Sequence, residues 1–509
     1  MKVLSSIGIC AVLLAVASLP RVAAAERACE SLTQLTLPNT TTLAEAVPAG
    51  DFSLPASGAE ATAQRFRNLP AFCRVAATLR PSRDSDIKME LWLPATGWNG
   101  KFQAVGNGGW AGVISYAAMS GALRRGYATS STDTGHTGNN GEFTYGHPEK
   151  YVDFAYRSEH EMTLKAKLII DAFYGNGPRI SYWNGCSTGG RQALKEAQRF
   201  PNDYDGIIAG ASANPRVHLE TEALWVAHAV LKDPASYIPP SKYPMIHKAV
   251  IEACDAIDGL KDGLINDPTQ CHFNPKVLQC KDGDGPECLT APQVEAAGKI
   301  LSPAINPRTG AQFFPGLEPG SELGWGAKAQ GPEPLSYATD FYKYVVFKNP
   351  NWDWRTFNFD SDLALADKID NGMTNATDPN LKAFMSHGGK LLMYHGWADP
   401  QVAPMASVNY YKSVADRMGG AEKTADWIRL FMVPGMGHCR GGEGPNTFDV
   451  VGAIEQWVEA KKAPVQMIAS HSTNGNVDRT RPLCPYPQVA RYKGSGSIDD
   501  AANFVCTVQ

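Results

Sequence analysis

The chain has 509 residues, a net charge of −4 at pH 7 and 43% hydrophobic residues. This is more than one hydrophobic core usually holds, so we expect a main domain and a second domain. The near-neutral charge, with Lys and Arg scattered along the chain, gives no electrostatic footprint for nucleic acid, and we expect no such partner.

The amino-terminal segment has the pattern of an export signal. Lys2 precedes a mostly apolar stretch at 3–19, and small residues follow at 23–25, which predicts a removed signal peptide over residues 1–25. No other stretch is long and apolar enough to cross a bilayer, so we predict a secreted or periplasmic protein without a membrane partner. Cleavage would remove Cys10 and leave ten cysteines, an even number that suits an oxidising compartment.

The first half of the chain has the elements of an α/β fold. Alternating hydrophobicity at 87–93 predicts a strand, and residues 102–105 and 127–129 predict two more. Residues 156–174 predict a helix. We assign these elements to the first part of an α/β main domain, over residues 26–212.

A glycine-rich loop follows the strand pattern at 101–104. Ester hydrolysis passes through an oxyanion that needs two N–H donors, and one of them normally comes from a loop of this kind. Gly108 and Gly109 are both candidates, and the sequence does not choose between them. The loop lacks the third, properly spaced glycine of a dinucleotide-binding motif, so nucleotide binding is the weaker interpretation.

Residues 185–189 spell Gly-Cys-Ser-Thr-Gly and fit the G-x-S-x-G nucleophile elbow. In isolation this pattern is usually an ordinary turn. Here a β-rich stretch at 179–183 predicts the strand before it, and residues 190–200 predict the helix after it. We therefore predict Ser187 as the nucleophile and the backbone N–H of Thr188 as an oxyanion donor.

Residues 213–380 are rich in Pro, Gly, Asp and Cys and have few strand patterns. We predict a lid domain over this range, with residues 381–509 as the second part of the catalytic domain. Within the lid, Asp255, Asp258 and Asp262 lie close together among glycines that permit tight turns. Carboxylates so spaced can surround a hard cation when backbone carbonyls complete the shell, although such a run in isolation is more often a solvated acidic turn.

A serine nucleophile needs a histidine base and a carboxylate that orients it. Asp399 follows a buried-strand pattern at 391–394, and His438 lies in a glycine-rich loop after the apolar run 427–433. The order Ser, Asp, His is that of α/β-hydrolases. Asp399 has an alternative role as the cap of a turn before Pro400. His395 precedes the aspartate, and we expect it to be structural.

Ser187 and His438 each neighbour a cysteine, Cys186 and Cys439. If these two cysteines form a disulfide, the cross-link would hold the nucleophile and the base within reach of each other. This disulfide would orient Ser187 and His438 relative to each other.

These features together resemble the tannase and feruloyl esterase family of secreted α/β-hydrolases, and the resemblance covers essentially the whole mature chain. The matching motifs are Cys-Ser at 186–187, Asp399, His-Cys at 438–439, Gly-Asn-Gly-Gly at 106–109 and Pro-Gly-Met-Gly-His-Cys at 434–439. The resemblance implies an α/β-hydrolase fold with a large inserted lid, hydrolysis of aromatic acid esters, and a structural Ca²⁺ in the lid. The implied calcium ligands are the side chains of Asp255, Asp258 and Asp262 and the carbonyl oxygens of Leu260 and Leu264. The implied disulfides are Cys29–Cys73, Cys186–Cys439, Cys254–Cys271, Cys280–Cys288 and Cys484–Cys506.

Aromatic acids need an apolar slot with a few polar groups. Trp110, after the oxyanion loop, and Val402, three residues after Asp399, are the best placed by chain position. Lid aromatics are further candidates for this slot: Trp325, Tyr337, Phe341 and Trp352. None of them identifies the acid.

We therefore expect an exported serine carboxylesterase that hydrolyses small esters of hydroxycinnamic or gallic-type acids through an acyl-enzyme. Ser187 would attack the ester, His438 would transfer the proton, and Asp399 would orient His438. The alternative with the same machinery is a hydrolase of mono(2-hydroxyethyl) terephthalate. An inactive exported binding protein on the hydrolase scaffold is disfavoured because all three residues are present. The sequence does not determine the oligomeric state.

Overall fold

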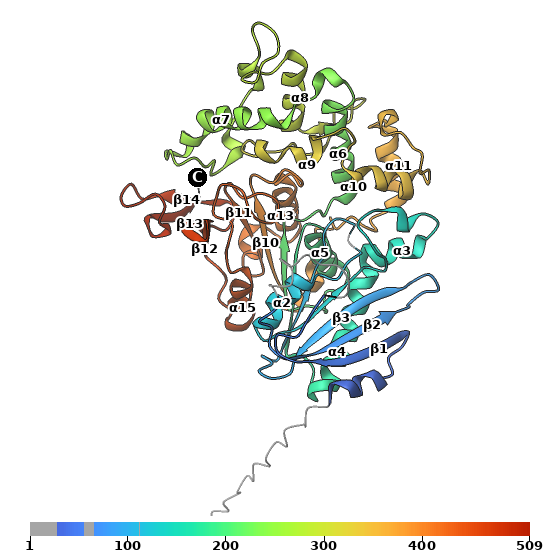
Figure 1. The fold of residues 1–509 in the computed structure, drawn as a ribbon. Helices are drawn as coiled ribbons and strands as arrows, with labels where there is room; N and C mark the ends of the chain where they lie inside the picture. The colour runs from blue at the N-terminus through green and yellow to red at the C-terminus, as the bar shows by residue number, and fades with distance from the viewer. Residues whose placement is uncertain (1–27, 55–65, 111, 509) are drawn as a thin grey trace, which may run out of the picture.

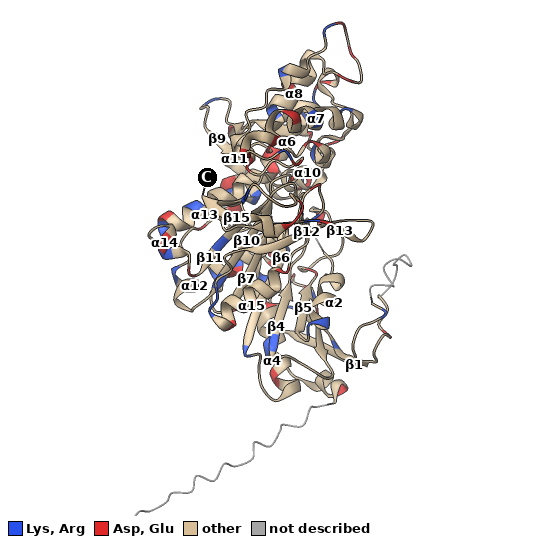
Figure 2. Ribbon diagram, turned by 90° about the vertical axis from the view of Figure 1, so that its left-hand side faces the viewer, with Lys and Arg blue, Asp and Glu red and all other residues tan. Residues whose placement is uncertain are grey.

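A computed structural model describes residues 28–54, 66–110 and 112–508. The predicted signal peptide at 1–25 lies outside these residues. Across the described ranges, no helix combines the length and apolarity needed to cross a bilayer. Acidic and basic residues are interspersed along the ribbon in the view of Figure 2.

The fold is organised around a nine-stranded sheet with the strand order β1-β2-β3-β5-β4-β6-β7-β10-β11 (Figure 1). The strands are β1 (Thr40–Val47), β2 (Phe72–Leu79), β3 (Ile87–Pro94), β4 (Lys101–Val105), β5 (Ala128–Thr132), β6 (Ile180–Cys186), β7 (Gly206–Gly210), β10 (Lys390–Gly396) and β11 (Ile428–Val433). In this order, the pairs from β5 through β4, β6, β7 and β10 to β11 are parallel, whereas the pairs β1–β2, β2–β3 and β3–β5 are antiparallel. Because parallel strands have their carboxyl ends at one edge, the loops after β4, β6, β10 and β11 meet there.

The buried strands place alternate residues in cores on opposite faces of the sheet. Leu391 and Met393 of β10 belong to the same core as residues of α4 (Ser158–Tyr174), α5 (Thr188–Arg199) and α13 (Met405–Arg417), whereas Leu392 and Tyr394 share a core with residues of α15 (Val450–Ala460). This alternation follows from the two-residue period of a strand, and burial on both faces explains the nearly continuous apolar runs in the sequence. The helices of this domain are α2 (Tyr116–Arg124), α3 (Pro148–Val152), α4 (Ser158–Tyr174), α5 (Thr188–Arg199), α12 (Lys382–Ser386), α13 (Met405–Arg417), α14 (Ala421–Thr424) and α15 (Val450–Ala460).

Helices dominate the segment between β7 and β10, which Figure 1 shows in green and yellow above the sheet. Its elements are α6 (Arg216–Val230), α7 (Tyr243–Cys254), α8 (Ala291–Leu301), the short pair β8 (Ala304–Ile305) and β9 (Gln312–Phe314), α9 (Gly326–Ala329), α10 (Ser336–Asp340) and α11 (Ser361–Asp370). This segment has its own apolar core, which continues into Val402, Ala403 and Ala406 of the catalytic domain. We refer to it as the lid; its predicted limits, residues 213 and 380, stay predictions.

The predicted elements near the nucleophile are present with shifted ends. The strand predicted at 179–183 continues as β6 to Cys186, and the helix predicted at 190–200 begins as α5 at Thr188. The helix predicted at 156–174 begins as α4 at Ser158, after a π-helical turn (Asp153–Arg157). After α15 the chain forms two antiparallel pairs that the sequence analysis did not predict: β12 (Met467–Thr473) with β13 (Asn476–Leu483), and β14 (Gln488–Tyr492) with β15 (Phe504–Val508).

Candidate active site

Ser187 occupies a sharp turn between β6 and α5. Its backbone has φ 64° and ψ −123°, a conformation that costs energy for a residue with a side chain. The turn is held by hydrogen bonds from Ser187 N to the Gly210 carbonyl (3.0 Å) and from Arg191 N to the Ser187 carbonyl (3.0 Å). This is the strand-turn-helix geometry that a nucleophile elbow requires.

Gly185 of the motif and Gly190, which follows it, are required by close backbone packing. A Cβ atom on Gly185 would lie 2.4 Å from the Gly189 carbonyl oxygen, and one on Gly190 would lie 2.3 Å from the Gly210 carbonyl oxygen. Because both neighbours are backbone atoms, the strain of a larger residue could not be relieved by a side-chain rotation. The glycines therefore allow the start of α5 to pack directly against β6 and β7.

His438 and Asp399 form a short hydrogen bond, in which His438 Nδ1 donates to Asp399 Oδ2 at 2.7 Å. Asp399 is fully buried, and its other oxygen accepts from the N–H groups of Gln401 (2.8 Å) and Val402 (3.0 Å). Burial opposes the charged form, but the His438 charge and the hydrogen bonds from His395 and His438 outweigh it and hold the pKa of Asp399 well below its usual value. Asp399 is therefore a carboxylate that can orient His438 and stabilise its imidazolium.

A disulfide brings the nucleophile and this His–Asp pair together. Cys186 and Cys439 are bonded, with their Cα atoms 6.0 Å apart, so Ser187 and His438 each adjoin one end of the same cross-link. The predicted pairing of the ten cysteines is confirmed in full. The other bridges are Cys29–Cys73, Cys254–Cys271, Cys280–Cys288 and Cys484–Cys506.

The loop after β4 packs on the first turn of α5. Gly189 N donates to the Asn107 carbonyl at 2.8 Å, and Thr188 Oγ1 donates to the Gly109 carbonyl at 2.8 Å. These two bonds place the loop that contains Gly108 and Gly109 beside Thr188, and the role of their N–H groups as oxyanion donors stays a prediction. Gly109 has φ 57°, whereas an added Cβ on Gly108 would meet no atom within 4 Å.

The lid touches this loop through Tyr337 of α10. Asn139 Nδ2 donates to Tyr337 Oη at 2.8 Å, and Trp110 Nε1 donates to the Tyr337 carbonyl at 3.2 Å. A Cβ atom on Gly109 would lie only 2.6 Å from Tyr337 Oη. A lid side chain therefore packs directly against the candidate oxyanion loop.

The three residues predicted to bind substrate lie in packed cores. Trp110 is fully buried beneath the Arg216 guanidinium, which is 4.2 Å from its ring centroid. Val402 and Trp325 are 2% and 1% exposed and belong to the lid core. None of the three lines the cavity beside His438 described next, and their role in substrate binding stays a prediction.

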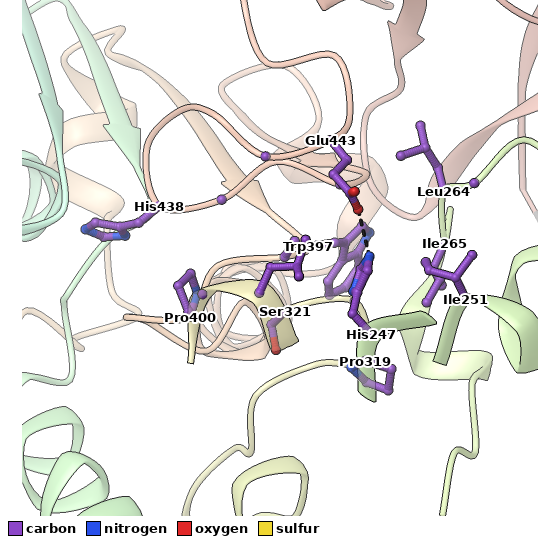
Figure 3. Close-up of a pocket in the computed structure, with 18 of the residues that line it drawn as sticks. His247, Ile251, Leu264, Ile265, Pro319, Ser321, Trp397, Pro400, His438 and Glu443 are labelled. Carbon is purple, nitrogen blue, oxygen red and sulfur yellow. Dashed lines mark hydrogen bonds and ion pairs between the residues drawn. The ribbon is translucent and has the colours of Figure 1, made fainter. Parts of the chain in front are cut away.

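A cavity of about 390 Å³ lies where the lid meets the loop that carries His438 (Figure 3). His247 of α7 donates from Nδ1 to Glu322 Oε2 (2.8 Å) in the lid and from Nε2 to Glu443 Oε2 (2.7 Å) in the catalytic domain. Burial opposes protonation, but the two carboxylates outweigh it and raise the pKa of His247 to about 9. Figure 3 shows the His438 ring directed away from this group, and His247 bridges the lid and the catalytic domain. No motif in the sequence indicated this bridge.

The predicted cation loop is compact and acidic. Asp255 accepts hydrogen bonds from the N–H groups of Asp262 (3.1 Å) and Gly263 (3.0 Å), and Asp258 accepts from Leu260 N–H (2.9 Å). Asp262 accepts from Leu264 N–H (3.1 Å) and pairs with the Arg481 guanidinium (2.6 Å). Within the described ranges, no three carboxylate, imidazole or thiolate side chains alone form a metal cluster. A cation here would therefore need backbone carbonyls, as the predicted ligand set includes.

His395 also contacts the candidate triad. Its position before Asp399 predicts a structural role, and its Nε2 atom lies 3.0 Å from Asp399 Oδ2. The only local sequence signal is the four-residue spacing to Asp399, which does not by itself indicate contact. The β10 carboxyl end and the turn that follows it bring the two side chains together.

Known proteins share both the sequence and the fold. Residues 73–507 match the model of the family described as tannase and feruloyl esterase. An uncharacterized esterase from Xanthomonas campestris pv. campestris is 39% identical, covering 97% of this chain and 93% of its own length. A probable feruloyl esterase B-2 from Neosartorya fischeri is 38% identical over 85% of this chain and 86% of its own.

Solved structures of related proteins share the fold of this chain. Feruloyl esterase B from Aspergillus oryzae superposes with a TM-score of 0.87 and 34% identity, covering 94% of this chain and 99% of its own. The tannin acyl hydrolase from Aspergillus niger, with a TM-score of 0.77, 23% identity and coverage of 93% and 92%, supports the fold. The predicted α/β-hydrolase fold with an inserted lid is confirmed. The chain belongs to the tannase and feruloyl esterase family and is a carboxylic ester hydrolase.

Proposed function

We propose that this protein is an exported serine esterase for esters of hydroxycinnamic or gallic-type acids, with Ser187, Asp399 and His438 as its catalytic triad. The observation that carries the proposal is the Cys186–Cys439 bridge, which joins the turn bearing Ser187 to the loop bearing the His438–Asp399 hydrogen bond. A serine hydroxyl is a weak nucleophile, and this arrangement supplies the base that it needs.

In the proposed reaction, Ser187 Oγ attacks the ester carbonyl while His438 Nε2 accepts its proton. Asp399 stays ionised and stabilises the imidazolium through its bond to Nδ1. The Thr188 N–H and an N–H of Gly108 or Gly109 bind the oxyanion. His438 then protonates the leaving alcohol, and water hydrolyses the acyl-enzyme by the same steps in reverse.

The acid specificity is supported by the names of the relatives, which include feruloyl esterases and a tannin acyl hydrolase. The second candidate is a hydrolase of mono(2-hydroxyethyl) terephthalate, which would use the same machinery on another aromatic acid ester. The half-buried Tyr337 of the lid, against the oxyanion loop, provides ring surface that either substrate could use.

The test compares kcat/KM for methyl ferulate, methyl gallate and mono(2-hydroxyethyl) terephthalate. We expect ferulate or gallate to be preferred; preference for the terephthalate ester would favour the second candidate. Ser187→Ala should abolish turnover and the product burst with an activated phenyl ester while leaving the circular dichroism spectrum unchanged. If the variant keeps more than about a thousandth of the parental rate, the nucleophile is another residue.

We also propose that residues 255–264 bind a structural Ca²⁺. The proposal is supported by an all-oxygen donor set, with side chains of Asp255, Asp258 and Asp262 and carbonyls of Leu260 and Leu264 as ligands. Charge supports it too: Arg481 pairs with Asp262, and the two other carboxylates are left for a divalent cation to neutralise. The bound ion would supply stability to the lid rather than chemistry to the triad.

The proposed location is the periplasm or the outside of the cell. Five disulfides support an oxidising compartment, because such bonds persist mainly in exported proteins. Fractionation of expressing cells, with cytoplasmic and periplasmic marker enzymes as controls, tests this location. Retention of the mature enzyme in the cytoplasm would contradict it.

A further inference from the structure

We infer that His395 is a positioning residue for the catalytic aspartate and that it sets how strongly Asp399 binds His438. This inference rests on the proposed roles of Asp399 and His438. His395 is fully buried at the end of β10 and lies outside the cavity beside His438, so it acts through Asp399 rather than on the ester.

The hydrogen-bond partners of His395 fix its tautomer. Its Nε2 atom lies 3.0 Å from Asp399 Oδ2 and 3.0 Å from the Val402 carbonyl. A carboxylate and a carbonyl can only accept, so Nε2 carries the hydrogen that both share. In the neutral ring Nδ1 is then an acceptor, and it receives the hydroxyl hydrogen of Ser407, 2.8 Å away on α13.

Four donors saturate the Asp399 carboxylate. Oδ1 accepts from the backbone N–H groups of Gln401 and Val402. Oδ2 accepts from two imidazoles, His438 at 2.7 Å and His395 at 3.0 Å. The oxygen that orients the proposed base is thus shared, and His395 supplies its only donor besides His438 among the contacts that the structure describes.

Sharing this oxygen has two physical effects. The His395 N–H stabilises the negative charge of Asp399 and so lowers its basicity toward His438. It also fixes the plane of the carboxylate, because a carboxylate held at both oxygens cannot rotate about its Cβ–Cγ bond without breaking hydrogen bonds. Without the His395 donor, Asp399 would bind His438 more strongly, favour the imidazolium, and hold the ring less accurately.

If His395 served only to fill space, loss of its N–H donor would change neither kcat nor the pH profile. His395 is enclosed by protein, so any large-to-small change would lower stability without revealing its function. The discriminating pair is His395→Met, which fills similar space without a donor, and His395→Gln, which places an N–H donor near the position of Nε2. His387→Met, at an exposed histidine of the same domain, controls for the substitution itself.

The experiment measures kcat, KM and the pH dependence of kcat/KM on the folded enzymes, after Ser187→Ala has shown that the activity depends on the proposed triad. In His395→Met we expect kcat to fall about tenfold or more, KM to stay within about twofold, and the acid limb of the profile to move to higher pH. His395→Gln should recover most of both losses. A His395→Met enzyme with parental kcat and an unmoved acid limb would overturn the inference.

Ser407→Ala provides a second test that keeps the imidazole, in case His395→Met does not fold. Ser407 is buried and far smaller, and its loss removes the donor that holds Nδ1 as an acceptor. We expect a smaller shift of the acid limb in the same direction and a change in the downfield proton resonance of the His438–Asp399 hydrogen bond. A lower melting temperature with neither change would also overturn the inference. If Ser187→Ala retains turnover, the proposed triad fails, and that result is separate from any outcome at His395.

Discussion

Cys186 and Cys439 are covalently joined across the sheet edge, which links the end of β6 to the loop after β11. Each cysteine is one peptide bond from a proposed catalytic residue, so the cross-link restricts the motion of the base relative to the nucleophile. Catalysis depends on such placement, because reacting groups that are misplaced by about 1 Å can lose on the order of a hundredfold in rate.

Removing this bridge should affect turnover beyond its effect on stability. The disulfide closes a loop with a sequence separation of 253, and a chain-entropy model assigns about 5 kcal/mol to a loop of that size. For Cys186→Ala with Cys439→Ala we expect a lower melting temperature and, where the protein is still folded, a kcat reduced by about tenfold or more. Cys484→Ala with Cys506→Ala is the control; it removes the bridge between the residue after β13 and β15, and it should lower stability alone. A near-parental kcat in the first variant would show that the Cys186–Cys439 bridge contributes only to stability.

Adding a methyl group at Gly109 of the oxyanion loop should lower the rate of catalysis. Gly109 has φ 57°, and an added Cβ would lie 2.6 Å from Tyr337 Oη and 2.7 Å from Asn139 Oδ1. Gly109→Ala must therefore shift the loop or the lid, and we expect kcat to fall about tenfold or more. Gly121→Ala, in an open position on α2, should keep the parental rate. Steady-state kinetics with one ester compares the two, and equal rates would mean that the Gly109–Tyr337 contact is irrelevant to turnover.

The hydrogen bonds from His247 to Glu322 and Glu443 should make a pH-dependent contribution to stability. Its pKa rises from 6.5 to about 9 on folding, so the folded state binds the proton more tightly than the unfolded chain. This contribution is complete below pH 6.5 and is lost as the pH rises through about 9. Urea unfolding across that range should therefore show a steeper loss of the free energy of unfolding in the parent than in His247→Gln. Parallel curves for the two proteins would contradict the charged bridge.

Calcium removal should lower thermal stability more than low-temperature turnover. A ligand that binds only the folded form stabilises it in proportion to the logarithm of its concentration. We expect chelation to lower the melting temperature, added Ca²⁺ to restore it, and Mg²⁺ to restore it less, because the smaller ion dehydrates reluctantly. Asp258→Asn should weaken the response. An unchanged melting temperature after chelation, with no metal found by elemental analysis, would rule out this site.

The candidate triad was predictable because each of its residues follows a pattern that short sequence windows contain. Ser187 lies in a motif whose glycines are required by local backbone packing, and Asp399 and His438 follow apolar runs that become adjacent parallel strands. Side-chain direction was not predictable in the same way. Trp110 and Val402 are near the site in the chain, but the folding of their loops turns both into packed cores.

Two contacts that the sequence did not indicate depend on how the chain folds around them. His395 reaches Asp399 because the turn after β10 folds back, which the spacing of the two residues does not specify. His247 meets Glu322, 75 residues away in the chain, within the folded lid, and it meets Glu443, 196 residues away, only after the lid docks on the catalytic domain. Such contacts depend on tertiary packing and leave no periodic pattern in the sequence.

The Cys186–Cys439 bond also turns the middle of the chain into a covalent ring. The lid and Asp399 lie inside this ring, between its two closing cysteines. A single proteolytic cut in a lid loop would open the ring without separating the two fragments, since both would stay attached through the disulfide. The nicked enzyme would therefore migrate as one molecule until a reductant is added, and the pieces carrying Ser187 and His438 would remain tethered to each other after damage that would split an uncrosslinked chain.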